Sequence, residues 1–298
     1  KKHSRKWPIL KLWHINGSLE SLSEKQLLYT FYELDSPTNE EINILKNQSK
    51  VFVSNNYTKS VFENFGIESI VLPLAFDSQN FKVINKKYYH DERIVFLLLG
   101  KFEKRKAHQK VIQAWLKKYG NNPRYFLNCA IFNPFLTQEQ NQQIFNQLTA
   151  GQQYFNLDFL GFMTQNELYN DFLNSGNIVI SMSCAEGFGL GEFHAVALGK
   201  HCVGLNAHGH KQWMTKENSI LVSPSGKEEV YDGMFFHKGQ PFNQGNIYTF
   251  NEDDFINGCE EAIKRVQLNR INEEGLKLQE KFTYKNLTES VIKDIESI

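Results

Sequence analysis

The chain has 298 residues, of which 41% are hydrophobic and 22% charged, and its 33 acidic residues balance its 33 basic ones. This composition is typical of a globular protein with one large or two medium domains. Because the formal net charge at pH 7 is zero, nothing indicates a polyanionic partner, and we expect no nucleic acid among its ligands.

The predicted elements alternate between strands and helices. In the first part we expect strands at residues 9–15, 27–32, 51–53 and 70–72, and helices at 38–46 and from 54–56 to 65. In the second part we expect strands at 94–99, 125–131, 158–160, 178–180, 202–205 and 220–222, and helices at 107–119, 138–148, 167–174, 192–198, 210–214, 253–268 and 284–297. This rhythm predicts an α/β fold with a doubly wound parallel sheet, whose ligands bind beyond the carboxyl ends of the strands.

The sequence has no pattern of a membrane-spanning or exported protein. Its longest clean apolar run, residues 94–99, is far short of the roughly 20 residues that span a bilayer. The basic residues 1–6 are not followed by the apolar core of a signal peptide. We therefore expect a cytoplasmic protein without a transmembrane segment, and contact with a membrane surface stays open.

No metal site is predicted from the cysteines and histidines. Their spacings fit neither a zinc site nor a disulfide framework, which favours buried, reduced thiols. The residues concerned are Cys129, Cys184, Cys202, Cys259, His194, His201, His208 and His210.

The segment 183–195 carries the strongest functional pattern. Gly187 and Gly189 punctuate the junction between a predicted strand and a predicted helix. Glycines let the backbone approach an anion closely, and the N–H groups and positive dipole end of the helix favour a phosphate. Glu186, at the rim, can accept hydrogen bonds from a polyol such as a sugar. The pattern suggests a nucleotide-sugar site, and a turn whose glycines serve packing alone is the alternative.

A cluster of cations follows the strand at 94–99. Lys101, Lys104, Arg105 and Lys106 lie close together in the loop that begins at Gly100. At the same edge of the sheet as the glycine junction, these cations could neutralise a diphosphate. A solvated charge run is the alternative interpretation.

Together, these segments resemble the retaining glycosyltransferases of the GT-B fold, the large family four group. The matching segments, in order, are Val53-Ser54-Asn55-Asn56-Tyr57, Leu72-Pro73-Leu74-Ala75-Phe76-Asp77, Gly100-Lys101-Phe102 with Lys106-Ala107, Asp158-Phe159-Leu160-Gly161-Phe162, Glu186-Gly187-Phe188-Gly189-Leu190 and Asn218-Ser219-Ile220-Leu221-Val222-Ser223-Pro224. The resemblance implies two Rossmann-like domains. They are an incomplete N-terminal, acceptor-side domain at 1–88 and a nucleotide-sugar-binding domain at 89–282, with a C-terminal helix at 283–298 that packs back toward the first domain.

The resemblance also implies an activity. A sugar moves from a nucleotide-diphosphate sugar to a hydroxyl of a glycan, lipid-linked or small-molecule acceptor, with retention of anomeric configuration and without a metal or other cofactor. Lys101 and Lys106 fall on the family's diphosphate-binding arginine and lysine, and Lys101 keeps the charge but not the bidentate geometry. Glu186 falls on the glutamate that contacts the transferred sugar. The further donor-binding positions fall on Gly100, Phe162, Gly187, Phe188, Gly189, Leu190 and His194.

Two departures from the family pattern put the activity in question. His194 stands where the family has a second glutamate, which holds the ribose hydroxyls. An imidazole can also form a hydrogen bond with a hydroxyl. An altered donor and a loss of activity are the alternatives. Glu192 lies about 200° away around the helix and is not expected to substitute. The first domain is short and lacks a glycine-rich loop. There, His14 is predicted as an acceptor-side catalytic group, with an ordinary strand-end histidine as the alternative.

The sequence thus leaves two functions open, a glycosyltransferase and a degenerate, non-catalytic nucleotide-sugar-binding or scaffold module. A nucleotide-sugar epimerase or dehydrogenase is disfavoured, because the first predicted strand is not followed by a G-x-G-x-x-G loop. The loop at His208 and His210 is expected to line the same cleft, with a mobile polar loop as its alternative.

Overall fold

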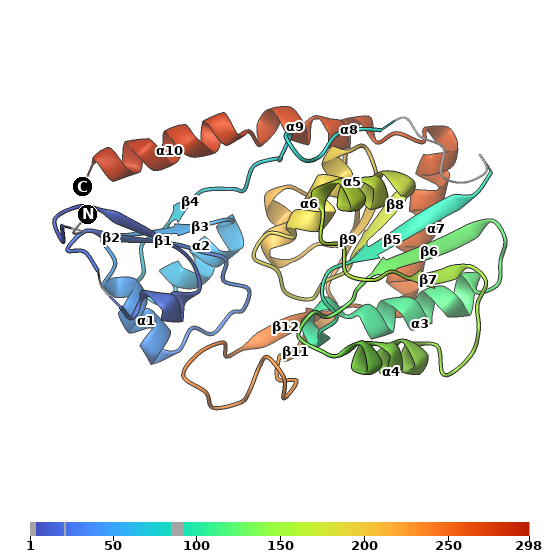
Figure 1. Ribbon diagram of the computed structural model, residues 1–298, viewed down its shortest axis with the longest axis horizontal. Helices are drawn as coiled ribbons and strands as arrows, with labels where there is room; N and C mark the ends of the chain where they lie inside the picture. The colour runs from blue at the N-terminus through green and yellow to red at the C-terminus, as the bar shows by residue number, and fades with distance from the viewer. Residues whose placement is uncertain (1–3, 21, 85–91, 298) are drawn as a thin grey trace.

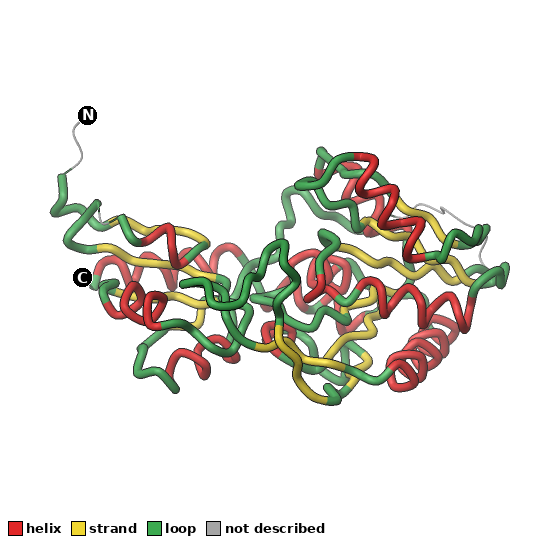
Figure 2. The backbone as a smooth tube through the Cα atoms, turned by 90° about the horizontal axis from the view of Figure 1, so that it is seen from below, coloured by secondary structure: helices red, strands yellow, loops and turns green. Residues whose placement is uncertain are grey.

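Two parallel β-sheets organise the molecule (Figure 1). The computed structural model describes residues 4–20, 22–84 and 92–297, and the predicted domain boundary between residues 88 and 89 lies outside the described residues. We call residues 4–20 and 22–72 together with the C-terminal helix α10 (Tyr284–Glu296) the N-terminal lobe, and residues 92–282 the C-terminal lobe. Figure 2 shows the two lobes from below.

The N-terminal lobe is a four-stranded sheet with helices on both faces. Its strands lie in the order β1 (Ile9–Trp13), β2 (Gln26–Thr30), β3 (Lys50–Val53) and β4 (Ile70–Val71). The short 3-10 helix η1 (Ile15–Ser18), α1 (Asn39–Lys46) and α2 (Asn56–Glu63) complete it. Because side chains alternate along a strand, Leu28 faces α1 and α2, whereas Leu27 and Tyr29 pack against α10.

Helix α1 illustrates why the local sequence forms these elements. Thr38 accepts a hydrogen bond from the backbone N–H of Glu41, and the Glu41 carboxylate accepts one from the Thr38 N–H, at 2.9 Å. This capping box satisfies two N–H groups that a helix start leaves unpaired. The predicted start of the helix at residue 38 therefore differs from the observed one only by the capping residue.

The C-terminal lobe is a six-stranded parallel sheet in the order β10-β9-β8-β5-β6-β7. The strands are β5 (Ile94–Leu99), β6 (Tyr125–Ala130), β7 (Leu157–Phe159), β8 (Ile178–Ser181), β9 (His201–Leu205) and β10 (Ile220–Val222). The helices are η2 (Lys104–Lys106), α3 (His108–Tyr119), α4 (Gln138–Leu148), α5 (Asn166–Ser175), α6 (Leu190–Ala197), η3 (His208–Gln212), α7 (Glu252–Leu268), α8 (Glu273–Leu276) and α9 (Leu278–Lys281). The predicted α/β fold with a doubly wound parallel sheet is confirmed.

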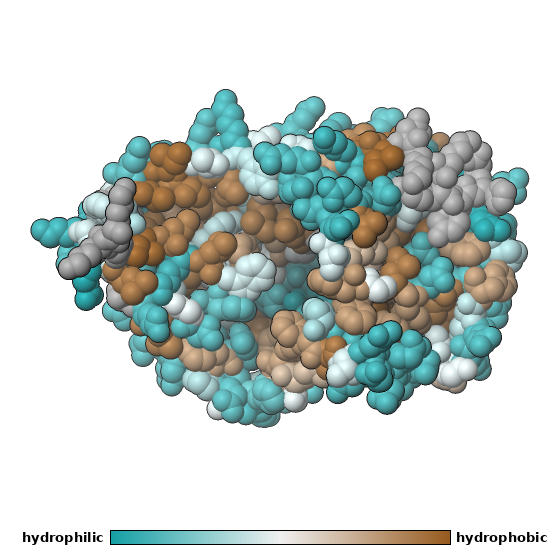
Figure 3. Space-filling model, in the orientation of Figure 1, coloured by the Kyte–Doolittle hydropathy of each residue, from teal (hydrophilic) through white to brown (hydrophobic). Residues whose placement is uncertain are grey.

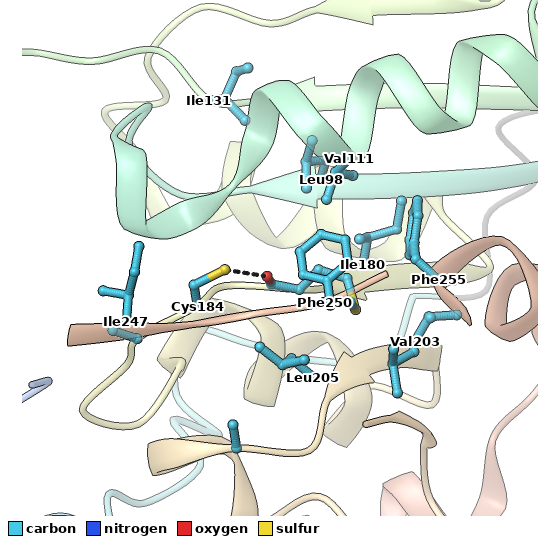
Figure 4. Packing of buried hydrophobic residues seen from close by; sticks show 14 of the residues in the cluster. Leu98, Val111, Ile131, Ile180, Cys184, Val203, Leu205, Ile247, Phe250 and Phe255 are labelled. Atoms are coloured by element: carbon cyan, nitrogen blue, oxygen red, sulfur yellow. Dashed lines mark hydrogen bonds between the residues drawn. The ribbon is translucent and has the colours of Figure 1, made fainter. Parts of the chain in front are cut away.

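Helices cover both faces of this sheet. Helices α3, α4 and α7 pack on one face, and α5, α6 and α9 on the other. In Figure 4, Val111 of α3 and Phe255 of α7 lie near the strand residues Leu98 and Ile180. With both faces covered, the central strands β5, β8 and β9 are buried at every position, as is usual in parallel sheets.

Residues 223–251 hold elements that the sequence analysis did not predict. Strands β11 (Gly226–Glu229) and β12 (Asn246–Thr249) pair antiparallel and lie between the two lobes at the bottom of Figure 1. Every residue of β11 is exposed, so the strand lacks the apolar alternation by which strands are recognised. Among the described residues, no helix has the length and apolar character needed to cross a membrane.

Candidate functional site

The sheet order brings two loops together at one point. Strands β5 and β8 are neighbours, and the chain leaves them toward opposite ends of the sheet, which makes their carboxyl ends the switch point where α/β sheets bind ligands. The loop after β5 is residues 100–107 and the loop after β8 is 182–189. They are joined by the Cys184 N–H, which donates to the Arg105 carbonyl at 2.7 Å.

Glu186 is the centre of the ion pairs at this point. Its side chain contacts the Lys106 ammonium, the Arg105 guanidinium at 3.0 Å and the Ser183 hydroxyl at 2.8 Å. Only 6% of the residue is exposed. Burial alone would raise the pKa of Glu186, but the charges of Lys106 and Arg105 outweigh it and hold the pKa well below its usual range. The carboxylate is therefore ionised at neutral pH and can only accept hydrogen bonds.

Lys106 lies between two carboxylates. Its ammonium contacts Glu186 and lies 3.8 Å from Glu192. Gly100 has φ +101°, and a Cβ there would come within 3.1 Å of the lysine side chain, so only glycine lets Lys106 cross the loop in this way. Glu192, which the sequence analysis set aside as a substitute for the missing family glutamate, nevertheless belongs to this cluster.

Arg105 is the residue that the sequence analysis did not single out. Its guanidinium contacts Glu33 at 3.0 Å, Glu103 at 2.7 Å and Glu186 at 3.0 Å. Burial would lower the pKa of Arg105, but the three carboxylates raise it above its usual value. The only sequence signal for this role is its position in the cationic run.

Lys101 points to different partners from Lys106. Its ammonium lies 3.9 Å from the centre of the Phe235 ring, 5.0 Å from that of Phe135 and 3.5 Å from the Glu103 carboxylate. Lys101 lines a cavity of about 580 Å³ between the two lobes, together with His14. The pKa of His14 is lowered, mainly by burial and to a smaller extent by the positive charge of Lys101. The two lysines predicted to bind one diphosphate therefore lie in separate surroundings.

Residues 187–190, which we call the glycine turn, are held in place by hydrogen bonds from several parts of the chain. The Gly187 carbonyl accepts hydrogen bonds from the Ser54 hydroxyl at 2.6 Å and from the Asn55 side chain, both in the N-terminal lobe. The Phe188 carbonyl accepts one from the Trp213 indole at 2.7 Å. Gly189 precedes α6 with φ +77°, a left-handed conformation that glycine adopts without strain. The turn is thus fixed in front of α6, whose first residue, Leu190, is exposed.

His194 is turned toward the connection between the lobes. Its Nε2 accepts a hydrogen bond from the Asp77 N–H at 3.2 Å, and its ring also bonds the backbone of Leu190. The ring packs on Phe81 with 4.3 Å between ring centres. Burial lowers the pKa of His194 to about 4, so the ring is neutral at pH 7 and its polar atoms are engaged by backbone.

The other predicted positions divide between surface and interior. Phe162, in the loop after β7, is 59% exposed. His208 and His210 are buried beneath the glycine turn, where His208 bonds the Ser183 carbonyl at 2.7 Å and His210 the Ser181 hydroxyl at 3.2 Å. They therefore support the turn from below. Within the described part of the chain, no group of side chains is arranged to hold a metal ion, and the four cysteines are buried and free.

Several solved structures of other proteins share this architecture. Neither a protein-family model nor a curated protein matches the chain. Among solved structures, it is similar to sucrose-phosphate synthase from Thermosynechococcus elongatus, with a TM-score of 0.69, 14% identity, and coverage of 93% of this chain and 68% of that one. The chain has a GT-B fold. GT-B structures similar to it include HepE from Anabaena in complex with UDP-glucose, with a TM-score of 0.67, 14% identity, and coverage of 95% and 75%. They also include trehalose-6-phosphate synthase, with a TM-score of 0.69, 13% identity, and coverage of 98% and 74%.

Proposed function

We propose that this GT-B protein is a glycosyltransferase that moves a sugar from a nucleotide-diphosphate sugar to an acceptor hydroxyl with retention of configuration. The observation that carries the proposal is the meeting of ionised Glu186 with Lys106 beside the glycine turn, at the switch point of the sheet. It is supported by the similar HepE structure, which contains UDP-glucose. In this proposal Glu186 accepts hydrogen bonds from the sugar hydroxyls, and the sugar lies against the turn 187–190.

The proposed chemistry needs no nucleophile from the protein. The bond between the anomeric carbon and the phosphate oxygen loosens, and the Lys106 ammonium and the N-terminus of α6 stabilise the charge that develops on the phosphate. The acceptor oxygen attacks from the same face, and its proton passes to the departing phosphate oxygen. Because protein cations and a helix end supply the positive charge, we propose that no metal takes part, and transfer should continue in the presence of EDTA.

A donor screen followed by two variants tests the proposal. UDP-, GDP- and ADP-sugars are compared by thermal shift, and one of them should raise the melting temperature. With that donor, Glu186→Gln should reduce transfer by at least about 100-fold, the cost of losing a group that acts at the reacting centre, while the nucleotide still binds. Lys106→Ala should weaken binding of the nucleoside diphosphate by about tenfold or more, and Lys117→Ala, on the exposed end of α3, should change neither. Full turnover in Glu186→Gln would overturn the assignment.

A non-catalytic nucleotide-sugar-binding module is the second candidate. It is favoured by His194, whose ring bonds backbone where the related family uses a carboxylate for ribose. The same screen separates the candidates. A module of this kind binds a nucleotide sugar without turnover in any acceptor mixture, whereas the transferase consumes its donor.

A further inference from the structure

The cavity between the lobes is closed on one side by a segment of the C-terminal lobe. We call residues 230–245, which connect β11 to β12, the strap. The Asn243 N–H donates to Glu41 at 3.0 Å, and Thr38 donates to the Pro241 carbonyl at 2.6 Å. Next to the strap, the Asn246 N–H donates to Asp35 at 2.8 Å. The strap thus reaches across to the N-terminal lobe, and the space-filling view shows a hollow between the lobes (Figure 3).

Aromatic side chains from three parts of the chain line this cavity. The N-terminal lobe contributes Trp13 from β1 and Phe31 and Tyr32 from the loop after β2, the loop after β6 contributes Phe135, and the strap contributes Phe235, Phe236 and Phe242. Trp13 is 58% exposed and Phe135 73% exposed, so large ring surfaces are available to a ligand. A pyranose presents an apolar C–H face that suits such rings and a rim of hydroxyls that suits the polar lining residues, among them Asn16, Glu33 and Asn243.

The charges of the lining argue against an anionic ligand. The acidic lining residues are Glu33, Glu41 and Glu103, and the cationic ones are Lys101 and Arg105. Burial raises the pKa of Glu33 to about 7, so at neutral pH its carboxyl is partly protonated and the lining still has no excess of positive charge. Both cations are already engaged with carboxylates of the same lining, Arg105 with Glu33 and Glu103, and Lys101 with Glu103.

In a third basic group of the lining, His14, the charged form is disfavoured, because burial and then the charge of Lys101 lower its pKa. A phosphoryl group brings a charge of about −1.5 to −2 at pH 7. Placing it here would break an existing ion pair or leave the phosphate without a counter-charge, and both cost free energy where Arg105 and Glu103 are buried. Lys106 is also paired with carboxylates, but the N-terminus of α6 beside it offers a phosphate further N–H groups, whereas no residue of α6 lines this cavity.

We propose that this cavity binds the acceptor, and that the acceptor is an uncharged saccharide rather than a phosphorylated sugar. The strap supplies the specificity of this site, because Phe242 belongs to a segment that closes the cavity from the opposite lobe. The inference rests on the proposed glycosyl transfer, but it concerns a cavity whose ligand can be measured without turnover.

The test measures binding of a glycan panel to the whole chain. The panel pairs neutral mono- and oligosaccharides with their 6-phosphates and with uronic acids, and binding is measured with and without the nucleotide selected by the donor screen. We expect a neutral member to bind at least about tenfold more tightly than its phosphorylated counterpart. Phe242→Ala should weaken that binding about tenfold and leave nucleotide affinity unchanged. Phe155→Ala, which removes an exposed ring from a different surface, is the matched control, and thermal unfolding checks that both variants fold.

The outcomes separate the two proposals. Preference for the phosphorylated or acidic member, or a nucleotide-binding protein that binds no glycan of the panel, overturns the inference and leaves the donor site intact. A protein that binds neutral glycans through Phe242 but no nucleotide overturns the proposed transfer and keeps the saccharide site.

Discussion

At the scale of single residues, Arg105 has the largest expected effect on stability. Its guanidinium is shared by Glu33, Glu103 and Glu186, and removing it leaves three carboxylates facing one another. Breaking a buried ion pair from one side costs about 3–5 kcal/mol, and we expect Arg105→Met to lower the free energy of unfolding by that amount. Arg105→Lys keeps the charge and should lose less. Urea unfolding measures both variants, and a Met variant as stable as the parent would contradict this account.

Glu33 should make the stability depend on pH. Burial raises its pKa from 4.5 to about 7 against the opposing charge of Arg105. The folded state therefore holds this proton more tightly than the unfolded state, and the contribution of Glu33 to stability is greatest below pH 4.5 and falls as the pH rises to about 7. In Glu33→Gln this dependence disappears. The unfolding free energy of the variant minus that of the parent, measured from pH 4.5 to 8, should increase as the pH rises. A difference that does not change with pH would refute this role of Glu33.

At the scale of elements, the strap depends on contacts beside it. Asp35 accepts the Asn246 N–H at 2.8 Å and the Lys227 ammonium at 2.7 Å. Because hydrogen bonds to a charged group contribute about 1.5–3 kcal/mol, we expect Asp35→Ala to speed amide hydrogen exchange in residues 230–245 by at least about tenfold. Glu229→Ala removes an exposed pair with Lys238 on the same hairpin and should have little effect. Equal exchange in the two variants would mean that Asp35 does not hold the strap.

The elements that could be predicted are those with a regular apolar pattern. The predicted strand at 94–99 and helix at 138–148 have the observed bounds. The strand is a short, continuous apolar run that is buried at every position, and the helix buries Phe145 and Leu148 at helical spacing. Strands β11 and β12 could not be found, since they are held by pairing with each other and by contacts to a distant lobe. The same limit applies to the site. The glycine turn and Lys106 can be predicted from the local sequence. The ion pair between Arg105 and Glu33 cannot, because it depends on how the two lobes pack against each other.

At the scale of the whole molecule, the chain crosses between the lobes twice, and the crossings lie side by side. The first crossing follows β4, and the second precedes α10. The Phe76 N–H of the first donates to the Phe282 carbonyl of the second at 2.8 Å. His194 packs against this junction through Phe76 and Phe81 and accepts the Asp77 N–H. A residue that family resemblance assigns to ribose is therefore placed to brace the connection between the lobes.

This position predicts the outcome of restoring the family's glutamate. In His194→Glu, a carboxylate would enter a pocket between aromatic rings, where burial disfavours its charged form. We expect a loss of about 3 kcal/mol in unfolding free energy at pH 7, equivalent to a pKa shift of about two units, and a smaller loss at pH 5, where the carboxyl can hold its proton. His194→Gln keeps an acceptor for the Asp77 N–H and should stay close to the parent. Nucleotide affinity and urea unfolding, measured on both variants, distinguish a role of residue 194 in ribose binding from a role in bracing the lobes. If His194→Glu bound the nucleotide more tightly without losing stability, residue 194 would face the ribose, and the bracing role would be wrong.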